Sequence, residues 1–171
     1  FMLTFFKKII LSLTIIFTIA LIFVFSTFFY FSSDLPDYKI LANYKPAVSS
    51  RVHSGEGQLI AEYAIQKRIF ISYNSIPKKV INSFLSAEDK NFFSHPGIDA
   101  KSITRAIIKN LRNIASKKRL EGASTITQQV AKNFLLTNEV SIKRKIKEAI
   151  LAFRIERAYS KERIMELYLN Q

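Results

Sequence analysis

The chain has 171 residues, no cysteine and a formal net charge of +13. The length suggests one domain with an appendage, and the lack of cysteine excludes disulfides and thiolate metal sites. Such a basic chain favours anionic partners, such as phospholipid head groups, pyrophosphates or nucleic acid. A compositional bias towards lysine would give the same charge.

An uncharged segment near the N-terminus predicts a membrane anchor. Residues 9–31 carry no charge, and a helix of that length spans roughly 34 Å, which is enough to cross a bilayer core. Lys7 and Lys8 precede it and Asp34 follows it. The positive-inside rule therefore puts residues 1–8 in the cytoplasm and the rest of the chain outside. A cleavable signal peptide is the alternative, but its apolar core would be shorter.

Residues 32–75 contain two regions of different composition. Residues 32–50 contain two prolines and few periodic apolar residues, and they predict a linker. Within residues 51–75, the runs 59–64 and 68–73 have the composition of short strands, and Gly55-Glu56-Gly57 is typical of a turn. We expect a small β-hairpin stem that lifts the following domain off the membrane.

From residue 76 to residue 171, apolar periodicity predicts a mainly helical domain. Thr125 and Gln128 have the spacing of a capping box, and Ser160 is a good N-cap. The helices that we expect are 77–87, 101–118, 124–133, 141–159 and 161–169.

The helix expected at 101–118 has an apolar stripe and several basic side chains on its other faces. Its stripe consists of Ile103, Ala106, Ile107, Leu111, Ile114 and Ala115. A basic amphipathic helix can lie on a membrane or on nucleic acid. We favour a stripe that packs in the core beneath a solvated basic face. No groove-reading motif or aromatic platform accompanies it, so no nucleic acid is expected as a partner.

Three clusters of polar residues are candidates for a site. Glu88-Asp89 follows an apolar helical run and precedes the Pro96-Gly97 turn, a position that equally suits capping or solvation. The helix at 124–133 begins with hydroxyl side chains and contains a lysine, as in a phosphate cradle. Arg144, Lys145 and Glu148 fall within one turn, where an ordinary surface salt bridge is the alternative.

Together with residues 164–170, these clusters resemble four successive motifs of the peptidoglycan glycosyltransferases of family 51. The resemblance covers residues 51–171, and it is closest to the N-terminal portion of the bifunctional class A penicillin-binding proteins. The motifs here are Glu88-Asp89-x-x-Phe92-x-x-His95-x-Gly97, Gly122-x-Ser124-Thr125-Ile126-Thr127-Gln128-Gln129-x-x-Lys132-Asn133, Arg144-Lys145-x-x-Glu148 and Ile164-Met165-Glu166-x-Tyr168-Leu169-Asn170.

The resemblance implies a lysozyme-like, mainly α fold that polymerises lipid II into glycan strands for cell wall synthesis. It implies a single-pass protein of the bacterial inner membrane with its catalytic part on the outer, periplasmic side. The implied partners are lipid II, the growing glycan strand and the cytoplasmic membrane, with a transpeptidase domain encoded beyond this chain. No fixed cofactor is implied, and a divalent cation, Mg²⁺ or Mn²⁺, at the pyrophosphate is left open.

The resemblance also assigns roles. Glu88 corresponds to the general base, and Glu148 to the second essential carboxylate. No residue is assigned to a metal. The residues assigned to the substrate are Asp89, His95, Ser124, Gln128, Gln129, Lys132, Asn133, Arg144 and Lys145.

The chain departs from the family pattern in two ways. Val140 stands where the family commonly has a basic residue, which removes one expected contact to the pyrophosphate. The chain ends at Gln171, before the family's fifth motif, so we expect a C-terminally incomplete domain with exposed apolar side chains. Those expected to be incompletely covered are Val130, Leu135, Ile146, Ile150, Phe153 and Ile164. A truncated or split-gene product that binds lipid II or a partner without turnover is the alternative function.

Overall fold

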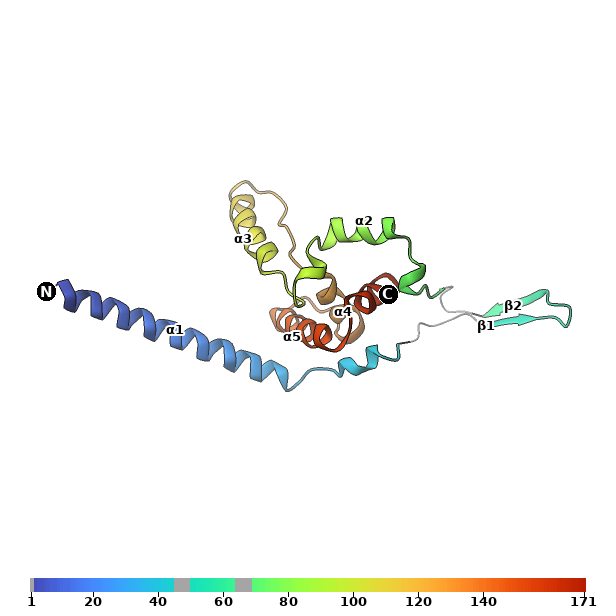
Figure 1. Ribbon diagram of the computed structural model, residues 1–171, viewed down its shortest axis with the longest axis horizontal. Helices are drawn as coiled ribbons and strands as arrows, with labels where there is room; N and C mark the ends of the chain where they lie inside the picture. Colours follow the sequence, from blue (N-terminus) through green and yellow to red (C-terminus); the bar gives the residue numbers. More distant parts are fainter. Residues whose placement is uncertain (1, 45–49, 64–68) are drawn as a thin grey trace. The chain divides into compact units, whose positions relative to one another are not determined.

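The computed structural model describes residues 2–44, 50–63 and 69–171 (Figure 1). The chain forms two compact units, Phe1–Leu35 and Pro36–Gln171. Within the described residues, one hairpin accompanies the helices, and the predicted mainly α class is confirmed.

Helix α1 (Met2–Ser32) makes up most of the first unit. Its segment Phe6–Ser32 is long and apolar enough to cross a membrane. The hydroxyl groups of Thr14, Thr18 and Thr27 donate to carbonyl oxygens four residues earlier, at 2.8 to 2.9 Å. These polar side chains are therefore satisfied within the helix, as hydrocarbon surroundings require. The helix has the properties of the predicted membrane anchor.

The predicted hairpin is present, and the strand predicted at 59–64 is confirmed over residues 59–63, with residue 64 outside the described residues. Its partner is not the strand that was predicted. Strand β1 (Ser50–His53) pairs antiparallel with β2 (Leu59–Tyr63), with a register irregularity between Val52 and His53. The predicted turn at residues 55–57 joins the two strands. The prediction of a second strand at 68–73 is wrong over residues 69–73, and residue 68 lies outside the described residues.

The segment after the hairpin bonds to the end of α6 (Lys161–Leu169) instead of to a strand. The amide of Asn170 accepts from the backbone N–H of Ile71 and donates to its carbonyl, both at 2.9 Å. The backbone N–H of Tyr73 donates to Glu166 Oε2 at 2.8 Å. These side chains satisfy backbone groups that a neighbouring strand would otherwise satisfy.

The core of the second unit lies among α4 (Ile126–Leu135), α5 (Ile142–Ala158) and α6 (Figure 1). Helix α4 packs against both α5 and α6. Val130, Ile150 and Ile164 are buried there, so the expectation that they are incompletely covered is wrong, whereas Phe153 is exposed as expected. The other fully buried apolar side chains include Ile126, Leu151, Ile155, Met165 and Leu167.

These helices begin at the residues that the capping rules select. Thr125 and Gln128 form the predicted capping box of α4, in which each side chain satisfies a backbone N–H of the other residue. The hydroxyl groups of Ser141 and Ser160 accept from backbone N–H groups at the start of α5 and α6. Local sequence therefore fixes where the three core helices start.

Helices α2 (Lys78–Glu88) and α3 (Ala100–Ala115) carry less of the core. The prediction that the apolar stripe of α3 packs in the core is wrong. Ala106 is buried, but Ile107, Leu111 and Ile114 are 56%, 66% and 65% exposed. Periodicity identifies an apolar face on a helix, but it does not identify a partner that covers it.

Part of the predicted linker is packed against the helical domain. Residues Tyr38–Leu41 form a short 3-10 helix, and Leu41 is buried. The hydroxyl of Tyr159 donates to the carbonyl of Tyr38 at 3.0 Å, and Arg163 donates to the carbonyl of Leu41 at 3.1 Å. The prediction of a linker missed these contacts because they join residues about 120 positions apart in the sequence.

Gly97 allows the loop between α2 and α3 to approach the backbone of α5. Its φ is +100°, a conformation that L side chains rarely adopt. A Cβ on Gly97 would lie 2.9 Å from the backbone carbon and oxygen of Ala152. A side chain at this position therefore meets both backbone strain and a rigid neighbour.

We expect Gly97→Ala to lower the free energy of unfolding by about 3 kcal/mol, because strain and overpacking each cost roughly 1–3 kcal/mol. Chemical denaturation monitored by circular dichroism measures this loss. Gly122→Ala is the matched control, since nothing lies within 4 Å of a Cβ there and its φ is not positive. Equal stability of the two variants would contradict the close packing of this loop on α5.

Candidate active site

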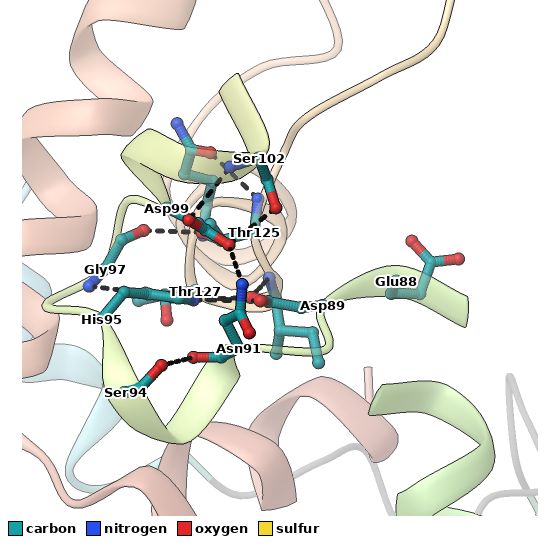
Figure 2. Close-up of polar contacts among 12 residues, drawn as sticks. Glu88, Asp89, Asn91, Ser94, His95, Gly97, Asp99, Ser102, Thr125 and Thr127 are labelled. Carbon is teal, nitrogen blue, oxygen red and sulfur yellow. Dashed lines mark hydrogen bonds and ion pairs between the residues drawn. The ribbon is translucent and has the colours of Figure 1, made fainter. Parts of the chain in front are cut away.

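The adjacent carboxylates of Glu88 and Asp89 at the end of α2 have different surroundings. Figure 2 shows Asp89 inside a network of polar contacts and Glu88 outside it. Asp89 is 6% exposed, whereas Glu88 is exposed. Asp89 has an extended φ of −157°, so the helical path ends there and the two side chains diverge. One of the two acids is structural, and the other faces solvent.

Asp89 joins the end of α2 to the start of α4. Both of its oxygens lie 3.0 Å from His95 Nε2, and Oδ2 also accepts from the backbone N–H of Ile126 at 3.1 Å. The backbone N–H of Gly97 donates to His95 Nδ1 at 3.1 Å. His95 Nε2 therefore carries the proton and donates to Asp89. The hydroxyl of Thr125 donates to the carbonyl of Gly97 and ties this loop to α4 again.

Glu88 contacts α4 one turn further along. Gln129 Nε2 donates to Glu88 Oε2 at 2.8 Å. The carboxylate of Glu88 also affects Tyr168 of α6. Burial raises the pKa of Tyr168, and the negative charge of Glu88 raises it further. Tyr168 is therefore neutral at physiological pH. An exposed carboxylate with one amide partner can take a proton from a bound hydroxyl group.

A second cluster forms around Glu148 on α5. Glu148 is 2% exposed, and Arg144 and Lys145 of the preceding turn each pair with one of its oxygens. Lys145 Nζ also donates to the hydroxyl of Ser124 at 2.6 Å. Two cations against one carboxylate leave a net charge of +1, and the side chain of Lys145 is about half exposed. This arrangement suits an anionic ligand.

Glu88 and Ser124 both line one cavity of about 430 Å³. The cluster around Glu148 adjoins this cavity through the hydrogen bond from Lys145 to Ser124. The cavity wall also contains Asp99, the N-cap of α3, which accepts from Asn91, from the hydroxyl of Ser102 and from two backbone N–H groups. The hydrogen bond from Ser102 is the main cause that holds the pKa of Asp99 well below its usual range. The remaining lining residues include Asp89, Lys90, Arg105, Lys109, Glu121, Gly122 and Thr125.

Three residues assigned to the substrate lie elsewhere or have another contact. Gln128 is buried in the capping box, where its Oε1 accepts from the backbone N–H of Thr125. Asn133 donates to the side chain of Gln171, and Lys132 is partly buried one turn after Gln128. Val140 is 94% exposed just before α5.

Sequence reasoning missed several residues that hold the site. Asp99 precedes a periodic helical run and matches an N-cap signal, which could have identified it. Glu156 and Lys161 make an ion pair at 2.8 Å behind the Asp89 loop. They lie on different helices, α5 and α6, so no helical spacing relates them. In the part of the chain that the structure describes, no three His, Asp or Glu side chains lie close enough to bind a metal ion.

An exposed carboxylate at a cavity, with a buried acid–histidine pair behind it and a cationic cluster next to it, suits an enzyme that transfers a group. The Transglycosylase family model matches residues 56–171, and the chain belongs to that family. The match covers β2, all of α2 to α6, and the residues around both Glu88 and Glu148.

Curated relatives share the sequence at high identity. The chain is 58% identical to penicillin-binding protein 1A of Rickettsia felis over 138 residues, which are 81% of this chain and 18% of that protein. It is 49% identical to penicillin-binding protein 1A of Aquifex aeolicus, over 81% of the chain and 19% of the relative. The protein of the same name from Neisseria lactamica is 43% identical over 80% of the chain and 17% of the relative. The chain thus spans less than a fifth of the length of these relatives.

We expect Glu148→Gln to lower the free energy of unfolding by roughly 3–5 kcal/mol, the usual cost of removing one partner from a buried ion pair. The change preserves the shape of the side chain but leaves Arg144 and Lys145 uncompensated. Urea denaturation measures the loss, and the exposed Glu139→Gln is the control. A loss below about 1 kcal/mol, the range of exposed pairs, would show that the cluster is solvated.

The lowered pKa of Asp99 predicts a pH dependence of stability. Its contribution is complete above the ordinary carboxyl pKa of about 3.9 and is lost as the pH falls below that value towards the lowered pKa. Asp99→Asn retains a capping side chain without the titration. We therefore expect the wild type to lose more apparent Tm between pH 5 and pH 3 than this variant. Parallel losses in the two proteins would contradict the assigned pKa shift.

Proposed function

We propose that this chain contains the reaction centre of a peptidoglycan glycosyltransferase, which polymerises lipid II into glycan strands. The observation that carries the proposal is the position of Glu88 on the cavity that Ser124 also lines, with the cationic cluster next to Ser124. Membership of the Transglycosylase family supports the reaction class. The anchor-like α1 and the net charge of +13 suit a lipid-linked anionic substrate.

In the proposed reaction Glu88 accepts the proton of the acceptor's 4-hydroxyl group. The freed oxygen forms a bond to the anomeric carbon of the donor sugar as the bond from that carbon to the pyrophosphate breaks. A single displacement inverts the configuration at this carbon. The polyprenyl pyrophosphate leaves as a stable anion, so stabilisation of its charge matters more than a protein acid.

The cationic cluster is the proposed site for that pyrophosphate. Lys145 is half exposed and already donates to Ser124, so it can donate to a phosphate oxygen without a change of backbone. Arg144 is more buried and keeps its pair with Glu148. In this proposal Glu148 holds the two cations in place, and Gln129 orients Glu88. The two lysines at positions 7 and 8 favour a cytoplasmic N-terminus and a reaction on the periplasmic side.

Glu88→Gln tests the proposal, because the nearly isosteric amide cannot accept the proton. We expect the full-length protein in detergent to polymerise labelled lipid II and the variant to lose about 10²–10⁴-fold in kcat, the usual contribution of a general base. Product length on gels and initial rates measure the effect. The variant should keep the apparent Tm of the wild type, since Glu88 is exposed.

Glu139→Gln, at an exposed position outside the cavity, should retain full activity. Binding of lipid II without any polymer from the wild type would refute the enzymatic proposal and support the non-catalytic alternative. Full activity of Glu88→Gln would show that another group accepts the proton.

A further inference from the structure

A buried polar cluster lies on the side of the Asp89 loop that faces α5 and α6. Lys161 Nζ donates to Glu156 Oε1 at 2.8 Å and to the carbonyl of His95 at 2.7 Å. The hydroxyl of Thr127 donates to the same oxygen of Glu156. The side chains of Glu156 and Lys161 are 7% and 19% exposed, and Thr127 is fully buried. We call Thr127, Glu156 and Lys161 the rear cluster.

Each end of the rear cluster attaches to an element that places a reactive residue. Thr127 lies in the first turn of α4, two residues before Gln129, which holds Glu88. His95 lies in the loop that begins at Asp89, the residue next to Glu88, and its ring donates to Asp89. The cluster therefore contacts both elements that meet at the pair of Glu88 and Gln129.

Lys161 also contacts an aromatic ring of the loop, which a simple surface ion pair would not do. Its Nζ lies 4.5 Å from the centroid of the buried Phe92 ring, within the range of a cation–π contact. Phe92 and His95 belong to one short turn of the loop. One ammonium group thus contacts this turn at two points, a ring face and a carbonyl oxygen, and fixes its position against α5.

Stability alone gives little reason for such a group. A largely buried lysine and glutamate lose hydration, and the net effect of such pairs on stability is often near zero. Fixed geometry is the other consequence of a buried, fully bonded cluster. A displacement of about 1 Å of a reacting group can reduce a rate about 100-fold, so small movements at this loop matter for Glu88.

We propose that Lys161 is a positioning residue, which acts through His95, Asp89 and α4 to hold Glu88 and Gln129 in their reactive arrangement. This inference rests on the proposed function. Lys161 itself does not line the cavity. Its loss should therefore lower kcat and leave substrate binding nearly unchanged.

The test compares Lys161→Met with Arg163→Met in the full-length protein. Arg163 is a matched control, since it lies on the same helix, pairs with Glu166 and donates to a backbone carbonyl, that of Leu41, outside the site. We expect Lys161→Met to lower the kcat of lipid II polymerisation about 10-fold or more with KM within about two-fold, and Arg163→Met to keep both. Lys161→Arg should recover part of kcat.

A second variant and a second measurement keep the test independent of folding defects. Lys161→Met combined with Glu156→Gln leaves no stranded charge but still frees the carbonyl of His95. Amide hydrogen exchange measures the mobility of the loop directly. We expect about 10-fold faster exchange over residues 89–97 and 125–129 in Lys161→Met and in the double variant, but not in Arg163→Met.

Unchanged kcat and unchanged exchange in the Lys161 variants, with only a lower apparent Tm like that of Arg163→Met, would overturn the inference. If the wild type makes no polymer, the proposed function fails. In that case amide hydrogen exchange by itself tests the role of Lys161. Faster exchange at these two segments supports positioning, and unchanged exchange refutes it.

Discussion

The buried carboxylate of Asp89 is the interaction on which the arrangement of the site depends. It ends α2, accepts from the His95 ring and accepts the first backbone N–H of α4. A buried carboxylate needs such donors, because an unpaired charge away from water is costly. The requirement brings three separate segments together within one group of hydrogen bonds. Glu88 is placed as a consequence, because it is the neighbouring residue and the helix ends between the two.

Much of the helical fold could be predicted from sequence, because local rules decide it. The predicted N-caps Thr125 and Ser160 are confirmed, and α6 has the predicted bounds. Tertiary contacts decide the features that were missed. Residues 69–73 have strand-like composition, yet Asn170 and Glu166 satisfy their backbone. The stripe of α3 has the periodicity of a core face, yet it remains exposed. Neither outcome is encoded within the segment concerned.

The candidate site, like the fold, could be predicted from the sequence only in part. Motif resemblance found the residues around both clusters, but it could not separate exposed groups from buried ones. Gln128 and Gln129 are adjacent and chemically identical, yet one caps α4 and the other contacts Glu88. Their difference follows from the direction of the first turn of α4. Glu156 and Lys161 were missed because their relation exists only after α5 and α6 have packed.

The site residues fall into two sets, those whose hydrogen bonds a ligand cannot easily displace and those whose hydrogen bonds it can. Asp89, His95 and Asp99 are buried with several partners, so a ligand could displace their bonds only at the cost of unpaired buried groups. Glu88 is exposed and accepts from the neutral amide of Gln129, and the half-exposed Lys145 donates to the neutral hydroxyl of Ser124 on the cavity wall as well as to Glu148. Water or substrate can replace such neutral partners at little cost. The proposed transfer of a lipid-linked sugar requires this combination, in which the groups that bind or react can change partners while the groups that hold them cannot.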